Sequence, residues 1–96
     1  MKEESYILIQ HYCETTSVDP EFIEQLFEYG LIQHLEHGDA PAVHQEELPI
    51  IERMARLHYD LEINLEGLQV IAHMRKKMIQ MQKQMIDLER KLKRFE

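Results

Sequence analysis

A strict heptad of apolar residues runs through the last third of this 96-residue chain. From residue 71 onward, the apolar positions follow one another at spacings of 3, 4, 3, 4, 3, 4 and 3. The members of this apolar seam are Ile71, Met74, Met78, Met81, Met85, Leu88, Leu92 and Phe95. Such spacing puts every member on one stripe of an α-helix and is typical of helices that pair in a coiled coil.

The seam predicts one long amphipathic helix from Asn64 to Glu96, with Asn64 as its N-cap. At the rise of an α-helix this segment would span about 50 Å, which is longer than a domain of this size is wide. An isolated amphipathic helix is marginal in water, so we expect the seam to form a homodimer interface. The length argues against the alternative, a helix folded back on its own domain. Four of the eight seam residues are methionines, which specify packing poorly, so parallel and antiparallel pairing both stay open.

The residues before the seam predict three shorter helices and a small hairpin. The expected elements are a strand or helix lead-in over 6–9, helices over 9–15, 20–29 and 45–61, and hairpin strands over 31–36 and 42–45. Asp19 is the expected N-cap of the second helix and Pro20 its first residue, because a first-turn proline loses no hydrogen bond. Gly30 is expected to end that helix. The chain thus divides into a domain over residues 1–62 and a long helix over residues 63–96.

Charge is divided unevenly along the chain. Residues 1–47 carry one lysine and eleven acids, a net charge of −10, whereas residues 48–96 carry ten Lys or Arg and seven acids, a net charge of +3. An acidic half repels phosphate backbones and suits a basic partner; a purely solubilising surface is the alternative. Within the acidic half, Glu21, Glu24 and Glu28 are spaced to share one face of the second helix.

The sequence holds no motif that points to catalysis. There is no G-x-x-x-x-G-K-[ST] loop and no G-x-G-x-x-G turn. His34, His37 and His44 lie near Glu36 and Asp39, but this set lacks the tight paired spacing and the cysteines usual in zinc sites. We therefore predict a non-enzymatic protein with no catalytic residue, no metal and no cofactor.

Three further features of the sequence bear on the cellular location of the protein. It holds no apolar run near the ~20 residues that a membrane span needs, and its first ten residues lack the apolar core of a signal peptide. A single cysteine, Cys13, excludes an internal disulfide and is expected to be a small core residue of the first helix. These features predict a cytoplasmic protein without membrane contact.

Taken together, these segments resemble the MerR-type winged-helix superfamily and, within it, the chaperone-modulator branch of CbpM-like proteins. The resemblance rests on Tyr12-Cys13, on Val18 and residues 21–31, and on the junction at residues 57–67, and it covers about residues 6–95. Its most distinctive stretch is DLEINLEG, residues 60–67. It implies a mainly α-helical fold: a winged helix-turn-helix with a small β-wing, followed by a long C-terminal coiled-coil helix that dimerises.

The resemblance also implies a function. CbpM-like proteins are adaptors that bind the J-domain of a DnaJ- or CbpA-like co-chaperone and modulate, mainly by inhibition, its action with a DnaK-type chaperone. J-domains present a basic helix to that chaperone, so Glu21, Glu24 and Glu28 are the residues that we expect to bind it. An adaptor for an unrelated partner, as in toxin–antitoxin pairs, is also compatible with the sequence.

The main alternative is a MerR-like dimeric transcriptional regulator that binds DNA. Such relatives typically place an arginine in the second helix, where this chain has Glu24, and basic residues in the wing. Here the wing, residues 38–44, has no Lys or Arg. Because DNA affinity rests largely on Lys and Arg that neutralise phosphates, both departures favour the adaptor.

Overall fold

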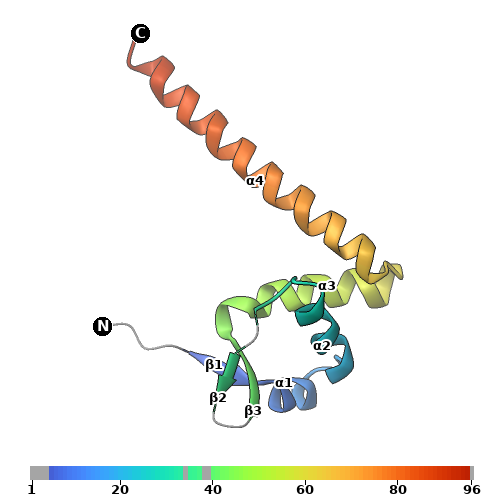
Figure 1. Cartoon of the computed structure of the whole chain (residues 1–96). Coiled ribbons are helices and arrows are strands. Elements are labelled where there is room, and N and C mark those ends of the chain that lie inside the picture. Colours follow the sequence, from blue (N-terminus) through green and yellow to red (C-terminus); the bar gives the residue numbers. More distant parts are fainter. Residues whose placement is uncertain (1–4, 34, 38–39, 96) are drawn as a thin grey trace.

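The computed structural model of the chain describes residues 5–33, 35–37 and 40–95. The elements are β1 (Tyr6–Leu8), α1 (Ile9–Thr15), α2 (Pro20–Glu28), β2 (Leu35–His37), β3 (Ala40–His44), the 3₁₀ turn η1 (Gln45–Glu47), α3 (Leu48–Leu61) and α4 (Leu65–Lys93). The elements from β1 to α3 form a head, from which α4 projects as one long rod (Figure 1). The predicted fold, a mainly helical winged helix-turn-helix with a long C-terminal helix, is confirmed.

The sheet of the head has three antiparallel strands in the order β1-β3-β2. β2 and β3 form the predicted wing, with Leu35 opposite Ala42. Residues 6–8 are a strand, which pairs with the other edge of β3 and places Leu8 opposite Ala42. Pro41 therefore lies beyond the end of β1, where β3 has a neighbour on one side only. That position suits a residue with no N–H to donate.

The wing strands are shifted from the predicted segments 31–36 and 42–45 for a physical reason. The Leu31 N–H donates to the Leu26 carbonyl at 2.9 Å and completes the end of α2. Ile32 is buried in the core. Neither residue is therefore free to join the sheet, and both strands begin and end nearer to the turn between them than predicted.

The helices agree closely with the prediction, because their limits are set by local signals. α1 has the predicted bounds. The helical segment predicted over 45–61 begins as the 3₁₀ turn η1 and becomes α-helical at Leu48, with Pro49 in its first turn. A proline is tolerated there because first-turn N–H groups have no partner within the helix.

Gly30 closes α2 with a positive φ of 73°. Its N–H donates to the Phe27 carbonyl at 3.0 Å, and the Leu31 N–H donates to the Leu26 carbonyl at 2.9 Å. This pair of bonds is the Schellman cap, which requires a left-handed residue between helix and loop. The predicted end of the helix at Gly30 is confirmed.

Replacing Gly30 by valine is expected to destabilise the head by about 1–2 kcal/mol, the cost of a left-handed backbone for an L-residue. No atom lies within 4 Å of the position that a Cβ would take, so backbone strain rather than a clash sets the effect. Urea unfolding followed by circular dichroism measures it. Gly30→Asn is the control, because asparagine tolerates the left-handed region; an equal loss in both variants would contradict this explanation.

Side chains from all the helices build the core of the head. The buried apolar residues include Ile9, Tyr12, Phe22, Ile23, Leu26, Ile32, Val43, Ile51, Met54, Ala55 and Leu68. Leu68 is the one residue of α4 in this set, and it is fully buried. Leu68 thus anchors the first turn of α4 in the head.

Three residues, 62–64, connect α3 to α4 and are hydrogen-bonded to both helices. Glu62 turns the chain with a φ of 56°. Asn64 caps α4 as predicted, its side-chain oxygen accepting from the Gly67 N–H at 2.8 Å. The Ile63 carbonyl lies 2.8 Å from His58 Nδ1, and because a carbonyl only accepts, Nδ1 carries the proton. His58 is thus a half-buried histidine at the boundary of the core.

Candidate functional site

The N-terminal end of α2 is fixed to α3. The Asp19 carboxylate accepts from the Glu21 N–H at 3.0 Å, which confirms Asp19 as the N-cap. The Asp19 N–H donates in turn to the Tyr59 hydroxyl at 3.3 Å. Phe22 stacks on the ring of His58, with centroids 4.6 Å apart and an interplanar angle of 18°. α2 therefore has a defined orientation in the head.

The C-terminal end of α2 is fixed to α4. The Tyr29 hydroxyl donates to the Glu66 carboxylate at 3.2 Å, and the Tyr29 carbonyl accepts from the Gln69 amide at 2.8 Å. The negative charge of Glu66 disfavours the phenolate and raises the pKa of Tyr29. Sequence reasoning missed this clamp, because its members lie some 40 residues apart and carry no local pattern. It ties the direction of α4 to the position of α2.

The outer side of α2 is an acidic face. Glu21, Glu24 and Glu28 are exposed, while the opposite side of the same helix is buried in the core through Phe22, Ile23 and Leu26. No Lys or Arg occurs between residues 3 and 52. The three predicted carboxylates thus share one exposed helical surface, and the segment that builds it supplies no cation to neutralise it.

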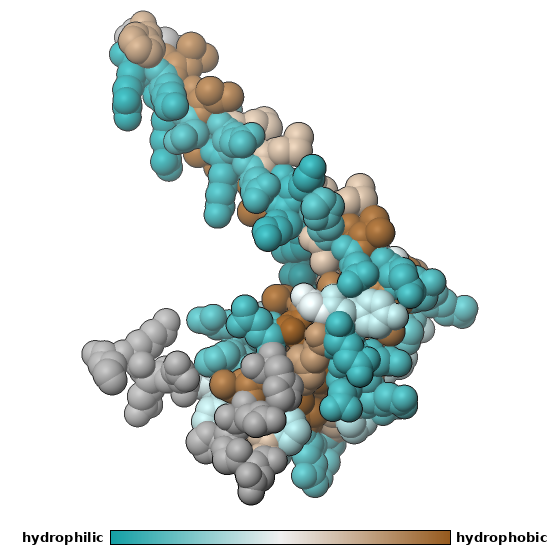
Figure 2. Space-filling view, in the orientation of Figure 1, coloured by the Kyte–Doolittle hydropathy of each residue, from teal (hydrophilic) through white to brown (hydrophobic). Residues whose placement is uncertain are grey.

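The apolar seam lies on the exposed length of α4. Ile71 is partly buried at the base of the helix, and the other seven seam residues are exposed, Phe95 to 87%. Figure 2 shows apolar side chains continuing along the rod beyond the head. Contiguous exposed apolar surface of this kind marks a protein interaction site.

A groove of about 740 Å³ opens between α3 and α4 and continues the seam toward the head. Leu57, Ile71 and Met78 contribute its apolar lining, and Arg53 and Arg75 add two positive charges. Partial burial, together with the charge of Arg75, lowers the pKa of Arg53. A helix laid along the seam would reach this groove, where a carboxylate would be favoured.

Comparison with known families adds to this geometry. Residues 7–90, from β1 to the last turns of α4, match the MerR helix-turn-helix family of regulatory proteins. The chain belongs to the MerR family. No curated protein matches it. The MerR family consists of non-enzymatic regulatory domains, and the superfamily part of the resemblance is thereby confirmed.

The described residues also bear on two other features, a metal site and a membrane-spanning helix. Among the described residues, no three His, Cys, Asp or Glu side chains are grouped to hold a metal ion. Two residues of the histidine-rich loop, His34 and Asp39, lie outside the described part. Within residues 5–33, 35–37 and 40–95, no helix is long and apolar enough to cross a membrane.

Cys13 differs from the expected core residue. It is only partly buried on α1. Burial, helped by the negative charge of Asp19, raises the pKa of its thiol, so the neutral thiol is the favoured form.

A pocket beside this cysteine is a feature that sequence reasoning missed, because β3, α1 and the start of α2 meet there only in the folded head.

Proposed function

We propose that this MerR-family chain is a homodimeric adaptor that binds the J-domain of a DnaJ- or CbpA-like co-chaperone and inhibits its action with a DnaK-type chaperone. The observation that carries the proposal is the exposed acidic face of Glu21, Glu24 and Glu28, in a segment, residues 3–52, that contains no Lys or Arg. A DNA-reading helix needs the opposite charge there.

Electrostatic complementarity supports the J-domain as partner. The basic helix of a J-domain is the surface that its chaperone binds, and the acidic face offers a competing surface of matching charge. Both ends of α2 are clamped, through Tyr59 at the start and Gln69 at the end, so the carboxylates are presented on a rigid element. Occupation of the basic helix by α2 would block the chaperone, and inhibition is the consequence.

The exposed seam supports the homodimer. Seven of its eight side chains are exposed in the single chain, and a second α4 laid on them would remove their surface from water. Two heads would then lie in one assembly, each with an acidic face. The adaptor would then be able to engage two J-domains.

Family membership favours a second candidate, a DNA-binding transcriptional regulator. In that role α2 would enter the major groove and the wing would contact phosphates. The charges oppose it, because the exposed side of α2 carries Glu21, Glu24 and Glu28, and residues 40–44 of the wing contain no Lys or Arg. A gel shift with random-sequence DNA at low salt distinguishes the two functions: salt-dependent binding would favour the regulator.

A titration of the full chain with a purified J-domain tests the proposal directly. We expect a dissociation constant on the order of micromolar at low salt, weakening as salt screens the carboxylates. The same concentrations should reduce the J-domain-stimulated ATPase rate of the DnaK-type chaperone. Absence of binding at tens of micromolar and low salt would contradict the proposal.

A further inference from the structure

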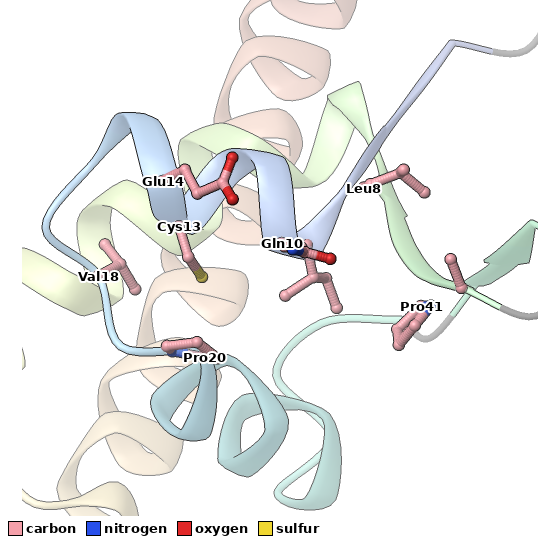
Figure 3. Close-up of a pocket in the computed structure, with 9 residues that line it drawn as sticks. Leu8, Gln10, Cys13, Glu14, Val18, Pro20 and Pro41 are labelled. Carbon is pink, nitrogen blue, oxygen red and sulfur yellow. The ribbon is translucent and has the colours of Figure 1, made fainter.

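A pocket of about 550 Å³ opens between α1, the start of α2 and β3. Its walls are mainly apolar, with Leu8, Ile9, Val18, Pro20 and Pro41 among the lining residues. In Figure 3 the Cys13 sulfur points from α1 into the space above Pro20, and Pro41 of β3 lies across it.

The fold explains why no side chain of residues 5–33, 35–37 and 40–95 fills this space. β1 turns into α1 at Ile9, whereas β3 continues past the end of β1 to Pro41. The α1–α2 connection then passes on the other side, with Val18 at the wall. The pocket thus lies where the wing meets the helix-turn-helix, and it is open toward the surface.

The rim of the pocket is acidic. Glu14 lines it, and Asp19 lies close enough for its charge to raise the pKa of the Cys13 thiol. Pro20 of the wall is followed directly by Glu21 of the acidic face. Because no Lys or Arg occurs between residues 3 and 52, the rim has no cation from this part of the chain.

We infer that the pocket is the anchor point for the basic helix of the partner, receiving one large apolar side chain while the neighbouring Lys or Arg residues meet Glu14 and the acidic face. This inference rests on the proposed function and adds a second contact to it. An apolar anchor in a pocket, bordered by charged contacts, is the usual arrangement of an interface hot spot. A neutral small molecule would leave the acidic rim unmatched.

Cys13 provides a direct test in the unmodified chain, since it is the single cysteine and lies in the pocket. Alkylation of Cys13 by N-ethylmaleimide is timed with and without a saturating J-domain, at a pH high enough to ionise the thiol. We expect at least about tenfold protection. The control carries Cys13→Ser with Gln80→Cys on exposed α4, whose alkylation the J-domain should leave unchanged.

Filling the pocket is a second test. Val18→Phe is expected to weaken J-domain binding about tenfold or more by occupying the anchor site. His11→Phe adds the same ring to an exposed position of α1 outside the pocket and is expected to bind like the wild type. Thermal unfolding of both variants establishes that the head is intact.

The outcomes separate the pocket from the proposed function. If the J-domain binds, but Cys13 stays unprotected and Val18→Phe binds normally, the anchor is wrong and the adaptor stands. If the J-domain does not bind, the alkylation of Cys13 is timed with an amphipathic Leu/Lys helical peptide instead. Protection by this peptide, but not by a matched Ser/Lys peptide, supports the pocket as an anchor for a basic helix. Protection by a neutral apolar dye but by neither peptide overturns it in favour of a small ligand.

Discussion

Replacing Met81 and Leu88 together by glutamate is expected to convert the proposed dimer to a monomer. Both are seam residues, exposed to 61% and 63% in the single chain, and helix pairing would bury them. Each substitution forfeits roughly 1.5–3 kcal/mol of apolar burial. It also places a carboxylate against apolar side chains of the partner helix, which adds to the loss. A combined loss of at least about 5 kcal/mol weakens association by more than about a thousandfold.

Sedimentation velocity over a range of concentrations measures this effect. The matched control, Gln80→Glu with Gln84→Glu, adds the same charge to the same stretch of α4 at positions outside the seam and is expected to remain a dimer. Neither seam residue belongs to the core of the head, so the head should unfold as in the wild type. An unchanged dimer in the seam variant would mean that another surface holds the two copies together.

Local signals account for what the sequence predicts well. Asp19 and Asn64 are caps whose side chains each bind a backbone N–H two or three residues ahead. Gly30 ends α2 because the cap there needs a left-handed residue. The period of the seam predicts an exposed stripe on α4 in the same way. Each of these features depends on residues within a turn or two of one another, so one sequence suffices.

Contacts between distant residues account for what the sequence could not predict. Pro41 is a turn former by composition, yet it lies in β3 because β1 ends before reaching it. The pairing of β1 with β3 depends on which strands the folded head places next to each other. The bond from Gln69 to Tyr29 and the pocket at Cys13 likewise arise only when separate elements pack. The spacing of residues in the sequence does not predict such contacts.

The candidate site divides in the same way. The common surface of Glu21, Glu24 and Glu28 follows from helical spacing, because positions three and four apart lie on one side. Whether that surface is rigid depends on contacts such as the stacking of Phe22 on His58, which lies 36 residues further along. The sequence thus predicts the charge of this surface, whereas the rigidity of the helix that carries it depends on the fold.

Reversing the charge of the acidic face with Glu21→Lys and Glu24→Lys is expected to reduce J-domain affinity by at least about a hundredfold at low salt. Two attractive contacts become repulsive ones, and like charges brought together across an interface cost several kcal/mol. Isothermal titration at two salt concentrations measures the change, which should shrink as screening increases. Glu46→Lys is the control, an exposed acid on η1 outside α2; binding of the double variant at wild-type strength would exclude α2 as the site.

The same variant also separates the adaptor from the DNA-binding regulator. If the head retains the docking geometry of MerR-family relatives and only its charge prevents DNA binding, two lysines on α2 should produce weak, salt-dependent binding to random-sequence DNA. If the variant loses J-domain binding and gains DNA binding, the charge of the exposed face of α2 determines which partner the chain binds. If instead the wild type binds DNA and the variant binds it no better, α2 does not contact DNA phosphates, and the charge argument for the adaptor fails with it.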